Sequence, residues 1–243
     1  MKARVLALTL GIACTVGCAH VETPRERALL LLAHGRIPQG IVELEKIRDA
    51  HPDDPQAHID LGHGYELAHR YDEALAAYDR AAEVKKTDPR GPREGGLRCA
   101  AWGEHEAAIP RLEEAIHRGD QDPRTFHALG FSRLQRGDKK GAREAYTAGL
   151  ATKDGDRDAT CVLGLATLAV IDEDGKEALR WYEELIKRRP KHAGAHLGRA
   201  WALTKLGRHG EADAALAEAV ELGATAQETA KLRVWMKEQR GPK

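Results

Sequence analysis

The chain has 243 residues, and its Lys and Arg residues equal its Asp and Glu residues at 38 each. Because there is no net positive charge to attract phosphates, the composition argues against a nucleic-acid-binding protein. Aromatic residues make up only 5% of the chain, whereas Ala, Leu, Glu, Arg and Lys are abundant, which favours an all-α fold over a large β-sandwich or barrel. Ser132 is the only serine and asparagine is absent, so a serine nucleophile has a single candidate.

The first residues have the pattern of a secretory leader. Lys2 and Arg4 precede the uncharged run 5–17, which is shorter than the roughly 20 residues of a membrane span but has the length of a signal-peptide apolar region. The run is followed by Cys18, and the sequence TVGC at this point resembles the bacterial lipobox, in which a small residue precedes a lipidated cysteine. The resemblance implies a lipoprotein signal peptide over residues 1–17 and a lipid anchor at Cys18.

Other features of this segment bear on the same assignment. Thr15 stands where the lipobox usually has Leu, and Cys14 is a second candidate with a shorter apolar run before it. The order Gly17-Cys18-Ala19 also satisfies an ordinary signal-peptidase site, which would release a soluble periplasmic protein. With Cys18 lipidated, Ala19 rather than Asp at the next position implies a lipid-anchored, periplasm-facing protein of the outer membrane.

The first helix is expected to begin close to this anchor. Thr23 to Glu26 form a capping box with Pro24 at the first helical position. Residues 18–22 then make up the lipidated cysteine and a tether of under roughly 18 Å. We therefore expect the folded part of the chain to lie against the membrane.

The rest of the chain consists of six copies of one unit. The pairs Asp54-Pro55, Asp88-Pro89 and Asp122-Pro123 are spaced by 34 residues, and Asp followed by Pro is a favourable helix start. A column of small residues follows the same period: Gly40, Ala74, Ala108, Ala142, Ala178 and Ala212. Four residues later comes a column of large apolar residues: Leu44, Tyr78, Leu112, Tyr146, Tyr182 and Leu216.

A period of 34 residues with these columns resembles the tetratricopeptide repeat (TPR), a helix–turn–helix unit. The resemblance implies a right-handed α-solenoid of six repeats over residues 23–226, closed by a C-terminal capping helix. The expected repeats are about 21–54, 55–88, 89–122, 123–156, 157–192 and 193–226, followed by the capping helix and tail over 227–243. One hairpin cannot bury its own apolar face, so the units must stack.

Small residues at facing positions let paired helices approach closely, and the tyrosines fill the gap to the next repeat. The expected repeat-packing residues are Gly62, Ala74, Tyr78, Ala108, Gly130, Ala142, Tyr146, Ala178, Tyr182 and Ala212. The fourth step of the small-residue column is 36 rather than 34. A second column of small residues lies twelve residues before the first: Ala28, Gly62, Gly96, Gly130 and, in the last repeat, Ala200. We expect the two extra residues in the turn at 172–175, which puts Gly164 in this second column in the fifth repeat.

Two further features are interpreted as structural. Leu232, Trp235 and Met236 share one face of the C-terminal helix, so we expect Trp235 to cover the last repeat. Cys99 and Cys161 lie two repeats apart, roughly 20 Å, and a disulfide needs Cα atoms within about 7 Å. We therefore expect two small buried side chains without a bridge.

No catalytic, metal-binding or cofactor-binding pattern stands out. His192 and His196 are four residues apart, as zinc ligands can be, but no third ligand is patterned with them. Ser132 falls inside a helix rather than at a sharp turn. We therefore predict no catalytic residue, no metal, no cofactor and a protein that is not an enzyme.

The remaining class of function is the binding of other proteins. In TPR solenoids the first helices of the repeats line a concave groove that holds extended peptides or helices. The groove residues that the resemblance implies are His63, Arg90, Arg93, Arg124, His127, Phe131 and Trp201, with Ile59, Leu97, Cys161, Leu165 and Leu197 beside them. The large apolar side chains Phe131 and Trp201 are the candidate anchors. Chaperone-binding TPR proteins grip a terminal carboxylate with asparagine and lysine, so the absence of asparagine argues against that subclass.

A lipid-anchored array of six such repeats is similar to the secretin pilot lipoproteins of type IV pilus systems. This resemblance implies a scaffold that binds secretin subunits and assists their assembly in the outer membrane. Two alternatives stay open: an adaptor for other outer-membrane machinery, and an accessory factor of an enzyme complex such as one that processes peptidoglycan. In each case the partner is a protein.

Overall fold

The computed structural model describes residues 22–155 and 159–241. Within these residues the chain forms thirteen α-helices and no β-strand, as the composition predicts. The expected signal peptide over 1–17 and the lipidation at Cys18 lie outside the described residues. The helices are α1 (Pro24–Ala33), α2 (Ile37–Ala50), α3 (Pro55–Leu67), α4 (Tyr71–Val84), α5 (Arg90–Trp102), α6 (His105–His117), α7 (Pro123–Gln135), α8 (Lys139–Leu150), α9 (Thr160–Ile171), α10 (Gly175–Arg188), α11 (Ala193–Lys205), α12 (His209–Glu221) and α13 (Ala226–Gln239).

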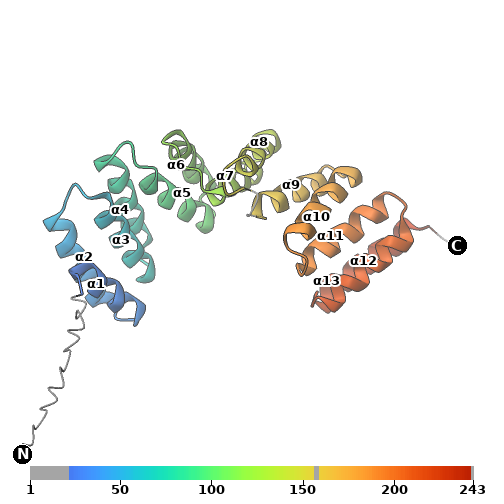
Figure 1. The fold of residues 1–243 in the computed structure, drawn as a ribbon, viewed down its shortest axis with the longest axis horizontal. Coiled ribbons are helices and arrows are strands. Elements are labelled where there is room, and N and C mark those ends of the chain that lie inside the picture. Colours follow the sequence, from blue (N-terminus) through green and yellow to red (C-terminus); the bar gives the residue numbers. More distant parts are fainter. Residues whose placement is uncertain (1–21, 156–158, 242–243) are drawn as a thin grey trace, which may run out of the picture.

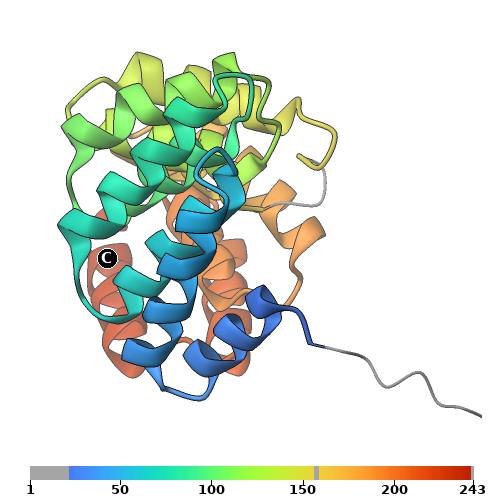
Figure 2. The same cartoon turned by 90° about the vertical axis from the view of Figure 1, so that its left-hand side faces the viewer.

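Consecutive helices pair through short turns, α1 with α2 and so on to α11 with α12, and the pairs follow one another along an arch (Figure 1). Helices α3, α5 and α7 lie along the inner side of the arch, and α4, α6 and α8 along its outer side. From α1 to α9 each odd-numbered helix also packs on the next one, whereas α9 and α11 meet chiefly through α10. Seen along the arch (Figure 2), successive hairpins are tilted against one another, so the stack is an α-solenoid.

The helix ends follow from the repeated sequence columns. Asp54 and Asp122 cap α3 and α7 by accepting backbone N–H bonds, and a proline follows each in the first turn. The turn inside each hairpin places one residue in the left-handed region, where glycine has no Cβ clash. These turn residues are Gly35, His69, Gly103, Gly137, Glu173 and Gly207.

Large side chains of the even-numbered helices fill the gaps beside glycines of the odd-numbered ones. A Cβ on Gly130 or Gly164 would lie 2.5 Å from the ring of Tyr146, so this ring is held between α7 and α9. Gly62 has the same relation to Tyr78. Any larger residue at these glycines would overlap the ring, because protein cores leave no spare volume. The ten expected repeat-packing residues are all buried in the structure: Gly62, Ala74, Tyr78, Ala108, Gly130, Ala142, Tyr146, Ala178, Tyr182 and Ala212.

The two extra residues of the fifth repeat lie before α9, and the expectation that they lie in the turn at 172–175 is wrong. That turn has the same length as the α7–α8 turn, and Gly137 and Glu173 hold the same left-handed position in the two turns. The connection from α8, which ends at Leu150, to α9, which begins at Thr160, is the longer one. The insertion therefore displaces the whole of α9 in the sequence register.

This shift changes which residue of α9 occupies each column. Ala166, which is fully buried, fills the second small-residue column, that of Gly62 and Gly130, in the fifth repeat. Gly164 instead receives the ring of Tyr146 from the preceding repeat, just as Gly198 receives Tyr182. The assignment of Gly164 to the column is thus corrected by two positions.

The C-terminal helix α13 packs against α11 and α12. Its Met236 is buried, and the ring of Trp235 stacks on Trp201 of α11 with 5.8 Å between ring centroids. Trp235 therefore covers the final repeat, as the sequence predicts. Cys99 and Cys161 are buried in separate core clusters, and no disulfide joins them.

Candidate protein-binding groove

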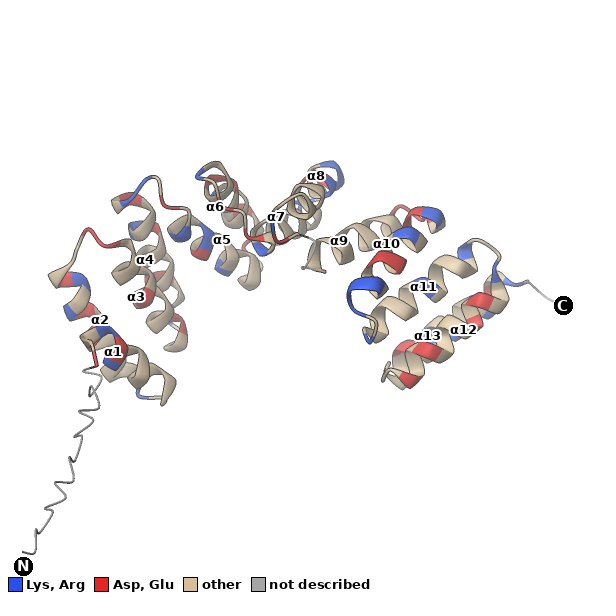
Figure 3. Ribbon diagram, in the orientation of Figure 1, with Lys and Arg blue, Asp and Glu red and all other residues tan. Residues whose placement is uncertain are grey.

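The inner face of the arch, formed by the exposed sides of α3, α5, α7, α9 and α11, is the candidate groove. Its two halves differ in chemistry. Charged residues occur along α3 and α5, whereas α9 carries none (Figure 3). The polar half consists of α3, α5 and the start of α7, and the apolar half consists of the rest of α7 with α9. Helix α11, which carries Arg199 and Lys205, follows the apolar half.

In the polar half, side-chain hydrogen bonds connect neighbouring repeats. Arg90 bonds Asp88 with its guanidinium and donates to the amide oxygen of Gln56 at 2.5 Å. Gln56 in turn donates to Asp60 at 2.7 Å, and Arg25 of α1 pairs with the same carboxylate. Residues 34 positions apart are stacked neighbours in this fold, so Gln56 and Arg90 meet directly. The arginines here are largely used to hold repeats together.

A second polar cluster surrounds Glu94 on α5. Its carboxylate lies 3.6 Å from Nε2 of His63, 3.2 Å from Arg93 and 3.5 Å from Arg98. Burial alone would raise the pKa of Glu94, but these three basic groups outweigh burial and hold the pKa below its usual range. The polar half of the inner face is therefore charged but internally neutralised.

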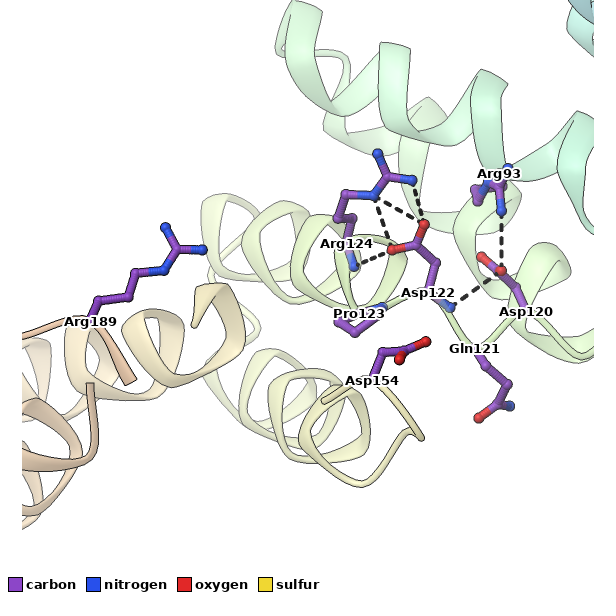
Figure 4. Close-up of a pocket in the computed structure, with 8 residues that line it drawn as sticks. All are labelled: Arg93, Asp120, Gln121, Asp122, Pro123, Arg124, Asp154 and Arg189. Atoms are coloured by element: carbon purple, nitrogen blue, oxygen red, sulfur yellow. Dashed lines mark hydrogen bonds and ion pairs between the residues drawn. The ribbon is translucent and has the colours of Figure 1, made fainter. Parts of the chain in front are cut away.

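A polar hollow of about 520 Å³ lies where α7 begins (Figure 4). Asp122 caps α7 and pairs with Arg124, while Asp120 accepts from the hydroxyl of Thr125 and lies 3.6 Å from Arg93. Figure 4 shows Arg189, which follows α10, on the far side of this hollow. The residues that line it are Arg93, Asp120, Gln121, Asp122, Pro123, Arg124, Asp154 and Arg189. Arg124 is the most exposed of the paired arginines here and is free to exchange its partner at little cost.

The apolar half contains a cavity of about 550 Å³ between α7 and α9. Phe131, which is 39% exposed, forms part of its wall, with His105 and His127 against its ring at centroid distances of 5.5 and 6.5 Å. An exposed aromatic ring held by neighbours at the edge of an apolar hollow is the typical form of a recognition site. The cavity is lined by His127, Phe131, Leu134, Gln135, Gly137, Lys139, Tyr146, Leu163, Gly164, Thr167 and Ile171.

Three residues that the resemblance placed in the groove are core residues instead. Cys161 and Leu165 are both 1% exposed, because the insertion before α9 turns them inward and brings Leu163 and Thr167 to the cavity in their place. Ile59 is also buried, within the cluster of the first two repeats. The register became clear only from the structure, in which the turns after α7 and α9 have equal lengths.

The remaining groove residues have mixed surroundings. His63, Arg90 and Arg93 belong to the polar half and are partly exposed, whereas Leu97 and Leu197 pack against core clusters. Trp201 stacks on Trp235, so α13 covers one of its faces. Among the predicted groove residues Phe131 is therefore the most exposed apolar side chain, and Ile171 of the same cavity wall is 45% exposed.

The histidines and the serine considered as metal ligands or nucleophile make structural contacts. His192 caps α11 through its Nδ1, and His196 bonds Glu218 and the carbonyl of Pro190, so neither ring is directed at a shared metal position. The hydroxyl of Ser132 is buried in α7, 3.4 Å from His105. None of the helices in the described part of the chain has the length and apolar character that a membrane span requires.

The Asp122 cap gives the fold an acid-sensitive component. Its hydrogen bonds from Arg124 hold the pKa of Asp122 below its usual range. Stability from this carboxylate is therefore present above the ordinary aspartate pKa of about 3.9 and is lost as the pH falls through the lowered value. We expect Asp122→Asn, which keeps a capping oxygen, to reduce the free energy of unfolding by roughly 0.5 kcal/mol at pH 7.

Urea unfolding of the wild type and of the Asp122→Asn variant at pH 7 and at about pH 2.5 checks this expectation, because protonation of Asp122 removes its difference in charge from asparagine. The difference in free energy of unfolding between the wild type and the variant should become smaller at the lower pH. Asp53→Asn, at an exposed residue just before the cap of α3, is the control. A difference that persists unchanged at low pH would contradict a charge-based role for Asp122.

A family profile for the tetratricopeptide repeat matches residues 25–92 and 163–227, which together exceed half of the chain. The chain belongs to the tetratricopeptide repeat family. TPR proteins are protein-interaction scaffolds, and the inner face described above is the surface that such a scaffold offers. No curated protein sequence matches the chain.

Several solved structures share this TPR fold. The pilF protein of Pseudomonas aeruginosa has a TM-score of 0.70 at 19% identity, over 87% of this chain and 96% of pilF. PilW, described as a widely conserved type IV pilus biogenesis factor, has a TM-score of 0.68 at 14% identity, over 86% of this chain and 96% of PilW. YrrB, described as a TPR protein with an unusual peptide-binding site, has a TM-score of 0.65 at 16% identity, over 78% of this chain and 97% of YrrB. At these identities the likeness shows the fold.

Proposed function

We propose that this chain is a lipid-anchored, periplasm-facing TPR scaffold that binds secretin subunits and assists their assembly in the outer membrane. The observation that carries the binding role is the division of the inner face. One half is neutralised by its own ion pairs, and the other leaves Phe131 exposed beside an apolar cavity of about 550 Å³. Exposed apolar surface of this kind on a soluble fold marks a docking site.

The location and the partner are supported by two further features. The leader pattern that ends at Cys18 favours export and lipidation. The fold is shared along almost its whole length with pilF and PilW, and PilW is described as a pilus biogenesis factor. Together they favour an assembly role at the outer membrane over a role in the cytoplasm.

Deletion of the gene tests the assembly role. We expect heat-resistant secretin multimers to be lost from the outer membrane while the amount of secretin monomer stays normal. Restoring the wild-type gene is the control. Intact multimers after deletion would contradict the proposal and favour a different envelope client, such as peptidoglycan-processing machinery.

The anchor is tested separately with Cys18→Ala. Wild-type protein from cells fed an alkyne fatty acid should carry the label and sediment with membranes, and the variant should lose both properties. Membrane attachment that survives Cys18→Ala would show that the anchor is assigned to the wrong residue.

A further inference from the structure

The first helix exposes more apolar surface than its repeat can cover. Residues 29–32 of α1 are four consecutive leucines, and consecutive positions of a helix point around more than half of its circumference. The core takes one side: Ala28 and Leu32 are buried, and Leu29 packs against the same cluster. Leu30 is left 43% exposed.

Basic residues surround this uncovered side. Arg27, Leu30, Leu31, His34 and Arg36 line a shallow hollow of about 510 Å³, which we call the α1 outer face. Neither Arg27 nor Arg36 pairs with a carboxylate in the described part of the chain, whereas Arg25 on the other side of α1 is paired with Asp60. The exposed Leu30, the half-buried Leu31 and these two arginines form an amphipathic, cationic surface.

The two ends of the solenoid also differ. At the C-terminal end α13 covers the last repeat, which is what a terminal element of a repeat array is needed for. At the N-terminal end α1 is the first described helix, and no other described helix covers its outer face (Figure 1). The outer face of a terminal repeat is normally polar, so the exposed Leu30 and the half-buried Leu31 beside it call for a covering surface.

We propose that the α1 outer face docks on an anionic lipid surface. The inference rests on the proposed function in one respect, since the described chain begins at Glu22 and the proposed lipidated Cys18 lies only four residues before it. So short a tether holds α1 within roughly 18 Å of the bilayer. Leu30 and Leu31 enter the boundary between headgroups and acyl chains, and Arg27 and Arg36 contact the phosphates.

The nearest acidic residue on α1 does not oppose this. The carboxylate of Glu26 is engaged with the backbone N–H and hydroxyl of Thr23 in the capping box. Docking by this face orients the arch at its N-terminal end and leaves the inner face open to a partner. The lipid surface thus takes the place that α13 has at the other end.

The test uses the protein as cells process and lipidate it. The purified protein is reconstituted in vesicles of phosphatidylcholine and phosphatidylglycerol that contain a nitroxide-labelled lipid. A fluorophore is attached through Ala33→Cys, one turn from Leu30, or through the matched control Ala230→Cys on α13; both alanines are exposed, and the native Cys99 and Cys161 are buried. We expect the lipid to quench about half of the fluorescence at residue 33 and less than about a tenth at residue 230, because only α1 reaches the headgroup region.

Further variants separate the contributions. Leu30→Gln with Leu31→Gln should remove most of the quenching at residue 33 while the protein stays with the vesicles. Arg27→Gln with Arg36→Gln should reduce the quenching by about half, and so should about 1 M salt, because phosphate contacts are screened. Vesicles of phosphatidylcholine alone should likewise give weaker quenching.

Each other outcome is decisive. Protein that stays with the vesicles but shows equally weak quenching at residues 33 and 230 would overturn docking and leave the anchor intact. Purified protein that carries no covalent lipid but whose fluorophore at residue 33 is still quenched on anionic vesicles would support docking and contradict the proposed lipidation. A dimer in sedimentation that dissociates in the Leu30→Gln, Leu31→Gln variant would show that a second copy covers this face, and docking on lipid would be wrong.

Discussion

Replacing Tyr146 with alanine should lower the free energy of unfolding by about 3–5 kcal/mol, the usual cost of removing a buried aromatic ring. The ring is 1% exposed and fills the space that Gly130 and Gly164 leave on α7 and α9. Neither glycine has a side chain that could move into the gap, so the cavity cannot close. The loss therefore falls on the junction between the fourth and fifth repeats.

Urea unfolding followed by circular dichroism measures this effect. Tyr71→Ala is the matched control, because Tyr71 is 45% exposed, and it should cost less than about 1 kcal/mol. Burial raises the pKa of Tyr146 to about 12, so its hydroxyl stays protonated and the difference between the variants should be constant from pH 6 to about pH 9. Equal losses for the two tyrosines would show that this ring is not the element that joins the repeats.

Phe131→Ala should weaken capture of the partner at least about tenfold, which corresponds to roughly 1.4 kcal/mol of binding free energy. The ring is an exposed part of the cavity wall between α7 and α9, and truncation removes apolar surface that a partner would cover. Stability should change little, because Phe131 is not part of a buried cluster. Titration of purified protein with the secretin's own purified segments measures the change in affinity.

Val220→Ala on the outer helix α12 is the control, because Val220 is as exposed as Phe131 but lies away from the groove. It should leave the affinity unchanged. If Phe131→Ala melts the array instead, the ring is a core residue. If both variants bind as the wild type does, the partner uses another surface.

The repeat architecture could be predicted from the sequence because it depends on a period. Small residues and tyrosines recur at fixed spacing, and the chain can bury both only by stacking hairpins. The caps at Asp54 and Asp122 and the glycine turns followed from local preferences of the backbone. These features need no knowledge of which distant residues meet.

The register of α9 was missed because its small residues allow two alignments. Gly164 and Ala166 both fit a small-residue column, and the period alone does not locate a two-residue insertion. Asp138 and Asp174, which cap α8 and α10, are 36 residues apart, which gives the size of the insertion but not its position. The error moved the candidate groove residues of that helix by two positions.

The chemistry of the inner face could be predicted only in part. Residues 34 apart are stacked, so a contact between Gln56 and Arg90 follows from the period. That Arg93 would pair with Glu94 and lie near Asp120, and that His63 of the second repeat would lie near Glu94, depends on side-chain directions that spacing does not give. The division of the groove into a neutralised half and an apolar half therefore became visible only in three dimensions.

The most direct test of the scaffold account is photocrosslinking in living cells. A photoreactive amino acid in place of Phe131 should link this chain to a secretin subunit, and the same amino acid in place of Val220 should give no such product. Crosslinks to secretin from both positions, or from neither, would contradict the conclusion that the inner face of the solenoid holds this partner.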